Sequence, residues 1–342
     1  MDKQIHDYPV DIVLPWVDGS DPVWRKKMAK YRGDNSEGGE SEERFRDFGL
    51  LRFVFRGIAE FAPWVRKVFF ITDGQKPDWL NTEYEKLVWI KHEDYIPSDY
   101  LPTFSANPIE LNLHRINELS EHFLYFNDDF YLLRRVEVSH FFRNGLPVES
   151  PLTAVVAPKT YDGFAHIALN NTMLINSSFS ARKVMKQAPD KWLSLRKCGA
   201  KTAARNFFSY CLGRFPGFTN PHLPSPFLKE SFRQVWEKYE PYLINTCSNR
   251  FRSYSDVSQY LVYEWQLATG CFEPEKSKKI GKYFCCRMDD PGLLQTIRRQ
   301  EEPVICINDA GEKLSPEEWS ALKQIIQDAF MSILPEKSQF EL

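Results

Sequence analysis

Up to residue 130 the chain alternates between short, continuously apolar runs and longer segments in which apolar residues recur at helical spacing. Continuous apolar runs bounded by turn residues are typical of buried strands. Leu51, Val54, Phe55 and Ile58 instead recur every three or four positions, which predicts an amphipathic helix over 47–61. Strands that alternate with helices predict a mostly parallel α/β sheet. The predicted strands are 10–14, 66–74, 86–92 and 122–126.

Side chains that cap helix N-termini mark where three helices begin. Asp21 followed by Pro22 predicts the start of a helix that runs towards residue 31. Asn107 followed by Pro108 predicts the same arrangement at the start of a helix over 105–120. Ser315, with a glutamate three residues later, predicts a capping box at the start of a C-terminal amphipathic helix.

Acidic or amide residues follow several of the apolar runs. Asp18 comes after the first predicted strand, and Asp73 lies at the end of the second. Asp128 and Asp129 come after the fourth. A later apolar run, in ICINDAGE, leads into Asn308. Ligands of open α/β sheets bind beyond the carboxyl ends of the strands. We therefore expect a binding site at this edge of the sheet.

Asp128 and Asp129 stand side by side after an apolar strand, where an unpaired charge is costly to desolvate. A divalent cation allows two adjacent carboxylates to coexist, and Mg²⁺ or Mn²⁺ takes oxygen ligands that include substrate phosphates. The alternative is a turn in which each aspartate caps backbone amides. The other acids at strand ends favour the metal site.

Trp16 and Asp18 lie in PWVDGSDP, directly after the first strand. An indole at a strand end can stack a nucleobase, and an acid can bind a base or ribose hydroxyl. An ordinary Asp-Gly turn is the commoner explanation of the same residues.

His222 lies between two prolines in GFTNPHLPSPF, which would hold its side chain rigidly. Histidine suits general acid–base catalysis because its ordinary pKa is near neutral. Arg252 precedes a predicted helix and could bind a phosphate through its planar guanidinium. His114, followed by Arg115, is explained as well by a hydrogen-bonded core position as by a functional one.

Composition narrows the class of function. The chain has 342 residues and a formal net charge of −2, so its charge gives no reason to expect a nucleic-acid partner. Seven cysteines without a CxxC pair indicate reduced thiols and a cytoplasmic protein. The polar N-terminus is unlike a signal peptide, and no apolar run reaches the roughly 20 residues of a membrane span. The P-loop, GxSxG and HExxH motifs are absent from the sequence.

Segment 180–214 carries nine lysine and arginine residues between aromatic and aliphatic ones. It is interpreted as a set of helices with a basic face. That face is either an ordinary solvated surface or a surface that binds anions. A lipid-linked glycan and peripheral association with the inner face of the cell membrane would fit the second interpretation.

Several long motifs resemble the Stealth family. They are DIVLPWVDGSDP, then RFRDFGLLRFVFRGIAEFAPWVRKVFFITDGQKPDWL, then LPTFSANPIELNLHRINELSEHFLYFNDD, and later GFTNPHLPSPF, RFRSYSDVSQYL and VICINDA. This family of capsular-polysaccharide phosphotransferases is similar to the catalytic α/β subunits of the animal N-acetylglucosamine-1-phosphotransferase. The resemblance implies a Rossmann-like, glycosyltransferase-A-type core with a helical addition in the second half. It also implies transfer of a sugar-1-phosphate from a nucleotide sugar, with a UDP-sugar favoured, to a glycan hydroxyl, with Mg²⁺ or Mn²⁺.

The matching motif positions imply the candidate site residues, to which Trp16 is added from its place after the first strand. Two departures from the family pattern are Leu14-Pro15, where Tyr-Thr is usual, and Leu50, where an acid is usual. The catalytic candidates are Arg115, His222, Arg252 and Asp256. The candidates for binding the donor are Trp16, Asp18, Arg52, Asp73, Gln75 and His114, and those for the metal are Asp128, Asp129 and Asn308.

Two other functions remain open at this point. A glycosyltransferase with the same core would break the anomeric bond and release a nucleoside diphosphate. A non-catalytic glycan-binding component of a capsule assembly complex would need no metal. In each case we expect a nucleotide-sugar-binding core over 1–175, a basic helical region over 176–260 and a return to the core over 261–342.

Overall fold

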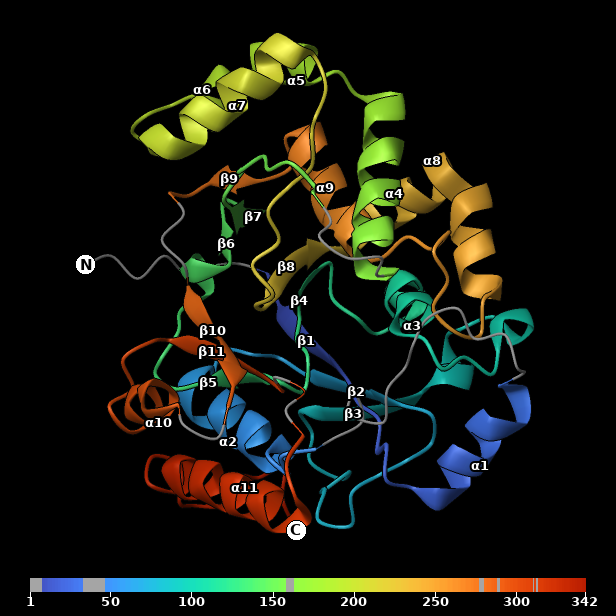
Figure 1. Cartoon of the computed structure of the whole chain (residues 1–342), viewed down its shortest axis with the longest axis vertical. Helices are drawn as coiled ribbons and strands as arrows, with labels where there is room; N and C mark the ends of the chain where they lie inside the picture. The colour runs from blue at the N-terminus through green and yellow to red at the C-terminus, as the bar shows by residue number, and fades with distance from the viewer. Residues whose placement is uncertain are drawn as a thin grey trace.

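The computed structural model describes residues 8–32, 47–157, 163–276, 280–287, 290–309, 311 and 313–342. Its centre is a five-stranded sheet with the strand order β3-β2-β1-β4-β8 (Figure 1). The first four strands in this order are parallel, and only β8 is antiparallel to its neighbour. The expected mostly parallel α/β core is confirmed. The strands are β1 (Val10–Pro15), β2 (Val68–Thr72), β3 (Leu87–Lys91), β4 (His122–Tyr125) and β8 (Ser225–Leu228).

The central strand β1 is buried on both faces and is apolar except for Asp11, which pairs with Arg66. Ile12 and Leu14 belong to the core on one side of the sheet, while Val13 belongs to the core on the other. The edge strand β8 contains Pro226, which a strand tolerates at an edge because proline has no N–H to donate. β8 lies within the segment expected to be helical, so the core sheet is not continuous in sequence.

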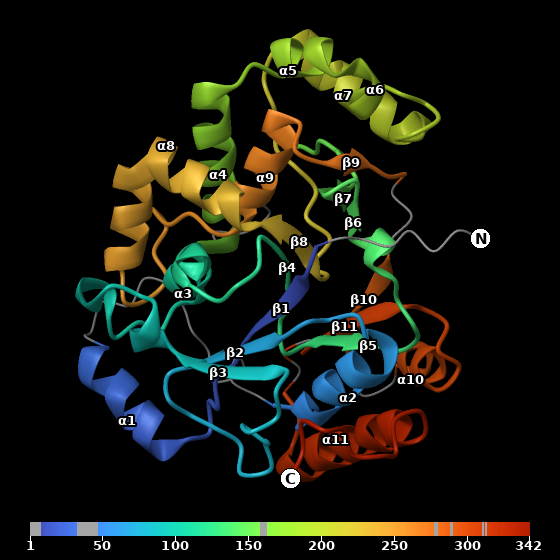
Figure 2. The same ribbon diagram turned by 180° about the vertical axis from the view of Figure 1, so that it is seen from behind.

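Helices cover both faces of this sheet (Figure 2). One face packs against α2 (Leu51–Phe61), α10 (Pro291–Arg298) and α11 (Pro316–Met331). The other packs against α4 (Gly163–Ser178), α8 (Lys229–Ser248) and α9 (Tyr260–Thr269). The first core therefore joins the beginning of the chain mainly to its end, and the second joins the beginning to the middle.

A three-stranded sheet lies beyond the end of β4. It consists of β10 (Gly281–Cys286), β11 (Val304–Asp309) and β5 (Phe130–Leu132), with β11 between the other two. The backbone N–H of Ile307 donates to the carbonyl of Asp129 at 2.9 Å, so β11 lies directly against the paired aspartates. A smaller sheet contains β6 (Phe142–Arg143), β7 (Leu146–Glu149) and β9 (Glu273–Pro274).

Two of the predicted helix starts are confirmed. Asp21 caps α1 (Pro22–Tyr31) by accepting from the Val23 N–H, and Ser315 forms the expected capping box at the start of α11. The helix predicted over 47–61 begins later, at Leu51.

The prediction for the helix at 105–120 was wrong in its cap and its length. Ser105, rather than Asn107, caps α3 (Ala106–Leu111), because the Ser105 hydroxyl accepts from the N–H of Asn107. The Asn107 side chain instead donates to the Asp256 carboxylate at 3.1 Å, which makes it part of a tertiary contact. A separate 3₁₀ turn, Leu113–Arg115, follows α3.

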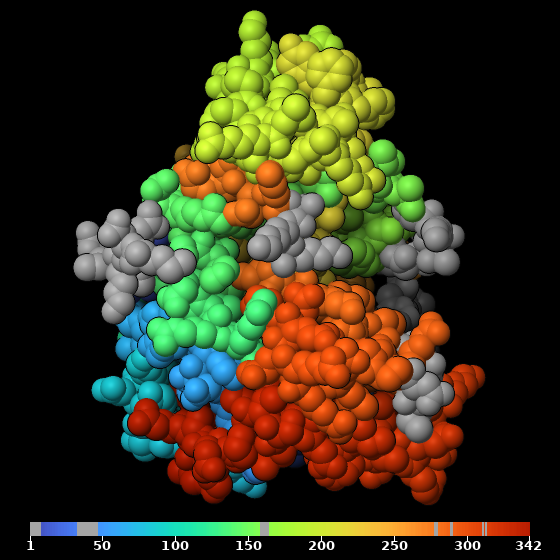
Figure 3. Space-filling model, turned by 90° about the vertical axis from the view of Figure 1, so that its left-hand side faces the viewer, coloured from blue at the N-terminus to red at the C-terminus, as the bar shows by residue number. Residues whose placement is uncertain are grey.

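The basic segment forms a helical unit at one end of the molecule (Figure 3). This unit consists of α5 (Ala181–Gln187), α6 (Pro189–Trp192) and α7 (Ala200–Leu212), and α4 connects it to the core. In the part of the chain that the structure describes, every helix is too short or too polar to cross a bilayer.

Candidate active site

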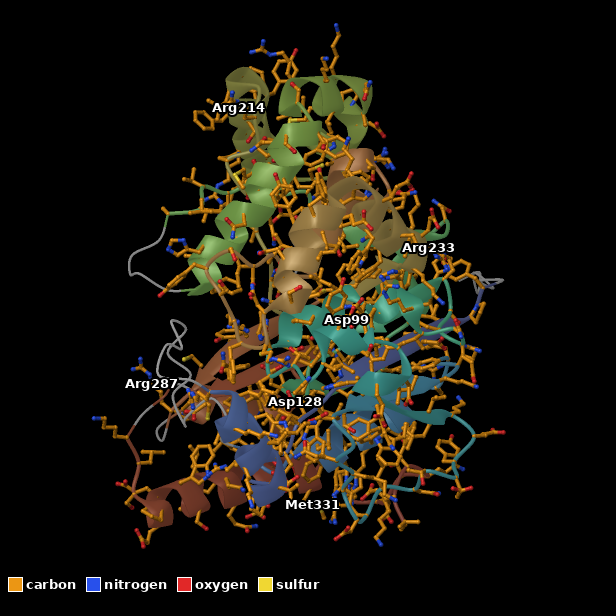
Figure 4. The ribbon with its side chains drawn as sticks, turned by 90° about the vertical axis from the view of Figure 1, so that its right-hand side faces the viewer. Asp99, Asp128, Arg214, Arg233, Arg287 and Met331 are labelled. Atoms are coloured by element: carbon orange, nitrogen blue, oxygen red, sulfur yellow. The ribbon has the colours of Figure 1, made fainter. Side chains whose placement is uncertain are left out.

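A cleft of about 920 Å³ opens beyond the carboxyl ends of the parallel strands. Figure 4 shows Asp128 between the core sheet and the helices above it. This is the edge at which the sequence predicts a site, and residues distant in sequence meet there. The predicted site residues that line the cleft are Trp16, Asp128, Asp129, His222, Arg252 and Asn308.

Asp129 links two other segments of the chain at the cleft through its carboxylate. Its Oδ2 lies 3.3 Å from His222 Nε2 and 3.3 Å from Cys306 Sγ. Its Oδ1 is buried and has no hydrogen-bond partner among the described residues. The other ring nitrogen of His222, Nδ1, lies 3.3 Å from the hydroxyl of Tyr260. A carboxylate with one unsatisfied buried oxygen is suited to a ligand that the protein itself does not supply.

Asp128 stands next to this carboxylate at the mouth of the cleft. The Asp128 residue is exposed to solvent in the open cleft. Partial loss of water beside the cleft walls, and then the charge of Asp129, raise the pKa of Asp128. Two carboxyl groups this close do not both ionise readily, unless a cation offsets their repulsion.

The residues present fit a divalent cation. Asp128, Asp129 and Asn308 line the same cleft and carry side-chain oxygens, the ligand type that Mg²⁺ and Mn²⁺ prefer. The Asn308 amide nitrogen donates to the Tyr283 hydroxyl at 2.8 Å, which fixes the orientation of this amide. Asp129, His222 and Cys306 also bring ligand atoms within 4.8 Å of one another, a mixed set that a softer metal would prefer.

Gln75 fixes the turn after β1 through hydrogen bonds, and Asp18 in this turn does not line the cleft. The Asp18 N–H donates to Gln75 Oε1 at 2.9 Å, and Gln75 Nε2 donates to the Asp18 carbonyl and the Asp21 carboxylate. The Asp18 carboxylate accepts from the N–H and hydroxyl of Ser20. Asp18 and Gln75 therefore join two strand-end loops, while Trp16 reaches the cleft.

Asp73 lies behind the cleft wall, where Lys27 forms an ion pair with it at 2.7 Å. His92, which does line the cleft, has its Nδ1 3.9 Å from Asp73. Burial lowers the pKa of His92 to about 4, so its ring is neutral. Arg52 lies elsewhere, with its guanidinium carbon 5.1 Å from the centre of the Trp79 ring.

His114 and Arg115 pack against α8 instead of lining the cleft. The centre of the His114 ring lies 5.8 Å from that of Trp236, and the Arg115 guanidinium lies 5.0 Å from the same indole. Burial, and then the charge of Arg115, lower the pKa of His114 to about 4. These contacts are those of a core position, the structural alternative that the sequence left open for His114.

Asp256 is fully buried below the loop that carries Arg252. It accepts hydrogen bonds from the side chains of Asn107 and Asn249 and from the N–H of Ser253. Asp256 thus holds the Arg252 loop to α3. Its geometry is that of a positioning residue.

Glu110 and Tyr260 are among the polar residues of the cleft that the sequence patterns did not single out. Glu110 lies on α3, is buried, and accepts a hydrogen bond from the Tyr125 hydroxyl at 2.5 Å. Burial raises the pKa of Glu110. Tyr260 reaches His222 from the start of α9. The available signal for Glu110 was a lone acid in the apolar stretch ANPIEL, where a buried charge needs a partner.

Comparisons with known proteins agree with these observations. Residues 8–36 match the model of Stealth protein CR1, conserved region 1, and residues 44–148 match that of Stealth protein CR2, conserved region 2. A "Receptor polysaccharide phosphotransferase WefC" of Streptococcus gordonii is 39% identical over 97% of this chain and 99% of its own length. A "Capsular polysaccharide phosphotransferase WcwK" of Streptococcus pneumoniae is 37% identical, again over 97% of this chain and 99% of its own.

An "Exopolysaccharide phosphotransferase cps2G" of Lactiplantibacillus plantarum is 36% identical over 98% of this chain and 96% of its own length. The likeness therefore extends past the two conserved regions, over the helical unit and the C-terminal strands and helices. The chain belongs to the Stealth family.

Proposed function

We propose that this protein is a polysaccharide phosphotransferase that moves a sugar-1-phosphate from a nucleotide sugar to a hydroxyl of a glycan acceptor. The observation that carries the proposal is the wall of the cleft formed by Asp128, Asp129 and His222, with Arg252 on the same cleft. Full-length relatives named as capsular, receptor or exopolysaccharide phosphotransferases support it.

The reaction transfers a phosphoryl group that carries the sugar. The acceptor oxygen forms a bond to the phosphorus next to the sugar, the P–O bond to the nucleotide breaks, and nucleoside monophosphate leaves. The anomeric C–O bond stays intact, so its configuration is retained without a glycosyl intermediate. The protein therefore needs to position the two substrates and to stabilise charge, and no covalent intermediate is required.

His222 is suited to accept the proton of the acceptor hydroxyl. Its imidazole gains a positive charge when it does so, and the Asp129 carboxylate 3.3 Å from Nε2 would stabilise that charge. Phe130 restricts the ring from the side, with its centre 5.3 Å from that of His222. With Nε2 directed at Asp129, the nitrogen that would accept the proton is Nδ1, which lies 3.3 Å from the Tyr260 hydroxyl.

Arg252 and the paired acids would share the charge of the donor. A divalent cation held by Asp128 and Asp129, with Asn308, would neutralise the diphosphate. Arg252 would bind the transferred phosphoryl oxygens through its planar donors. Trp16 lines the cleft at the end of β1 and would stack the base of the nucleotide, for which we favour uracil.

The released nucleotide tests this proposal against the glycosyltransferase alternative. Purified protein is incubated with Mg²⁺, a panel of nucleotide sugars and a glycan acceptor, and the products are separated. Nucleoside monophosphate supports the proposal, while nucleoside diphosphate assigns a glycosyl transfer. Binding of glycan without turnover of any donor would make the protein a non-catalytic component.

We propose that the reaction takes place in the cytoplasm. Cys198, Cys247 and Cys306 are buried free thiols, which favours a reducing compartment.

A further inference from the structure

Helix α7 presents its phenylalanines to solvent and its uncharged polar residues to the protein. Its buried positions are Thr202, Ala203, Asn206 and Ser209. Phe207, Phe208 and Leu212 are 57%, 58% and 54% exposed. A helix on the surface of a soluble protein normally has the opposite arrangement. The exposed apolar face therefore calls for a partner outside the chain.

Hydrogen bonds of Asn206 fix this orientation. Its side-chain oxygen accepts from the N–H and hydroxyl of Thr153, and its amide nitrogen donates to the carbonyls of Pro151 and Trp192, each at 2.8 Å. The Ser209 hydroxyl adds a bond to Thr153. A rotation of α7 that buried the phenylalanines would leave these groups unpaired in the interior, which is costly.

The charge around this apolar face is strongly positive. Residues 179–214 contain nine lysine or arginine residues and one acidic residue, Asp190, which gives this segment a net charge of +8 in a chain of −2. Asp190 pairs with Lys197, and among the described residues this is the only ion pair of the segment. Lys201 and Arg205 are exposed on α7 itself, and Arg182 lies against its C-terminal end.

We propose that this face of the helical unit binds the surface of an anionic lipid bilayer. Exposed aromatic and aliphatic side chains rimmed by basic ones insert into the region between headgroups and acyl chains, and the basic residues bind the acidic headgroups. A soluble polyanion would use the charges but leave the phenylalanines in water. A second copy of this chain would bring two basic surfaces together, which repel each other.

The position of the unit agrees with this proposal. It projects from one end of the molecule (Figure 3), and Figure 4 places Arg214 at that end and Met331 at the opposite one. Phe164 and Ile167, near the start of α4, line the cleft, and the 16 residues of α4 then rise to the unit over about 24 Å. This spacing would let the cleft reach the sugars of a lipid-linked acceptor above the bilayer. That interpretation rests on the proposed function.

Co-sedimentation with vesicles tests the proposal. Purified protein is mixed with vesicles of phosphatidylcholine alone or with one third phosphatidylglycerol, at low and high salt. We expect binding to the anionic vesicles only, weakened by salt. The variant Lys201→Gln with Arg205→Gln should bind about 30-fold more weakly, since each basic residue near an anionic surface contributes roughly a factor of five.

The variant Phe207→Ser with Phe208→Ser should also lose vesicle binding, which distinguishes insertion from charge attraction alone. Ile325→Ser, an exposed apolar residue on α11, is the matched control and should bind as the unchanged protein does. Melting temperatures check that each variant folds. Turnover with a soluble acceptor is measured separately, so failure of the proposed function is distinguishable from failure to bind membranes.

Three results would overturn the proposal. One is equal binding by the unchanged protein and the Phe207→Ser, Phe208→Ser variant. Another is binding to polyphosphate or to an anionic polysaccharide without binding to vesicles, which would assign the face to a soluble polyanion. The third is a dimer in sedimentation velocity that the phenylalanine substitutions disperse.

Discussion

At the scale of single residues, the proposed active site depends on Asp129 and its neighbours. Its two carboxylate oxygens have different environments: Oδ2 meets His222 and Cys306, and Oδ1 is buried without a partner among the residues the structure describes. Burial and the charge of Asp129 raise the pKa of the Cys306 thiol, so the sulfur keeps its proton and donates to the carboxylate. The arrangement concentrates negative charge at the cleft.

Replacing Asp129 by asparagine removes that charge with almost no change of shape. We expect Asp129→Asn to lose at least about 100-fold in turnover, the scale typical of a removed electrostatic group, while its melting temperature stays close to that of the unchanged protein. Asp99→Asn, at an exposed aspartate outside the cleft, is the matched control and should be fully active. Near-normal turnover of Asp129→Asn in saturating Mg²⁺ would remove this residue from the metal site.

His222→Ala tests the proposed base. Loss of a general base costs roughly 10²–10⁴-fold in rate, and we expect that loss in kcat with little change in stability. Circular dichroism melting alongside steady-state kinetics separates the two effects. A purely structural histidine would lower the melting temperature and leave turnover per folded molecule unchanged.

At the scale of elements, the C-terminal segment is attached to α2 by a buried ion pair. The Arg56 side chain is 8% exposed and that of Glu341 is 1% exposed, and they form two hydrogen bonds, at 2.8 and 2.9 Å. Arg56 also donates to the carbonyls of Leu334 and Pro335. The end of the chain is therefore part of the core that supports β1 and β2.

Glu341→Gln leaves the Arg56 charge buried without its carboxylate. We expect the free energy of unfolding to fall by roughly 3–5 kcal/mol, as for other broken buried pairs, measured by urea denaturation. Glu230→Gln, which removes an exposed partner of Arg233, should cost less than about 1 kcal/mol. Equal effects of the two substitutions would contradict the structural role of the C-terminal segment.

Strand β7 ends in a buried acid, Glu149. Burial raises its pKa to about 8, against a hydrogen bond from Tyr263 that lowers it. Between the ordinary value near 4.5 and about 8, the folded protein binds this proton and the unfolded chain does not. Stability from this group is therefore present at low pH and lost as the pH rises through this window, by up to about 1.4 kcal/mol per pH unit.

Glu149→Gln should make stability less dependent on pH between about 4.5 and 8. Urea denaturation of the variant and the unchanged protein at several pH values measures the difference. Identical pH profiles would mean that Glu149 is ionised in the folded protein.

At the scale of the whole molecule, the sequence predicted what depends on local patterns. The apolar runs identified the four parallel strands, and the strand-end acids identified the correct edge of the sheet. Local patterns of this kind do not predict contacts between segments that are distant in the sequence. His114 and Arg115 lie in a specific motif, yet both contact Trp236 of α8, more than 100 residues later, and only the folded chain shows this. Cys306 and Tyr260 were not predicted either, because no local pattern places them beside Asp129 and His222.

The measurement that tests the central claim most directly is the chemical identity of both products. The protein is incubated with a UDP-sugar, Mg²⁺ and a glycan acceptor, the nucleotide is identified by chromatography, and the glycan is examined by phosphorus NMR. The account predicts uridine monophosphate and a phosphodiester resonance on the glycan, both absent with Asp129→Asn. Uridine diphosphate, with a glycan free of phosphorus, would contradict it.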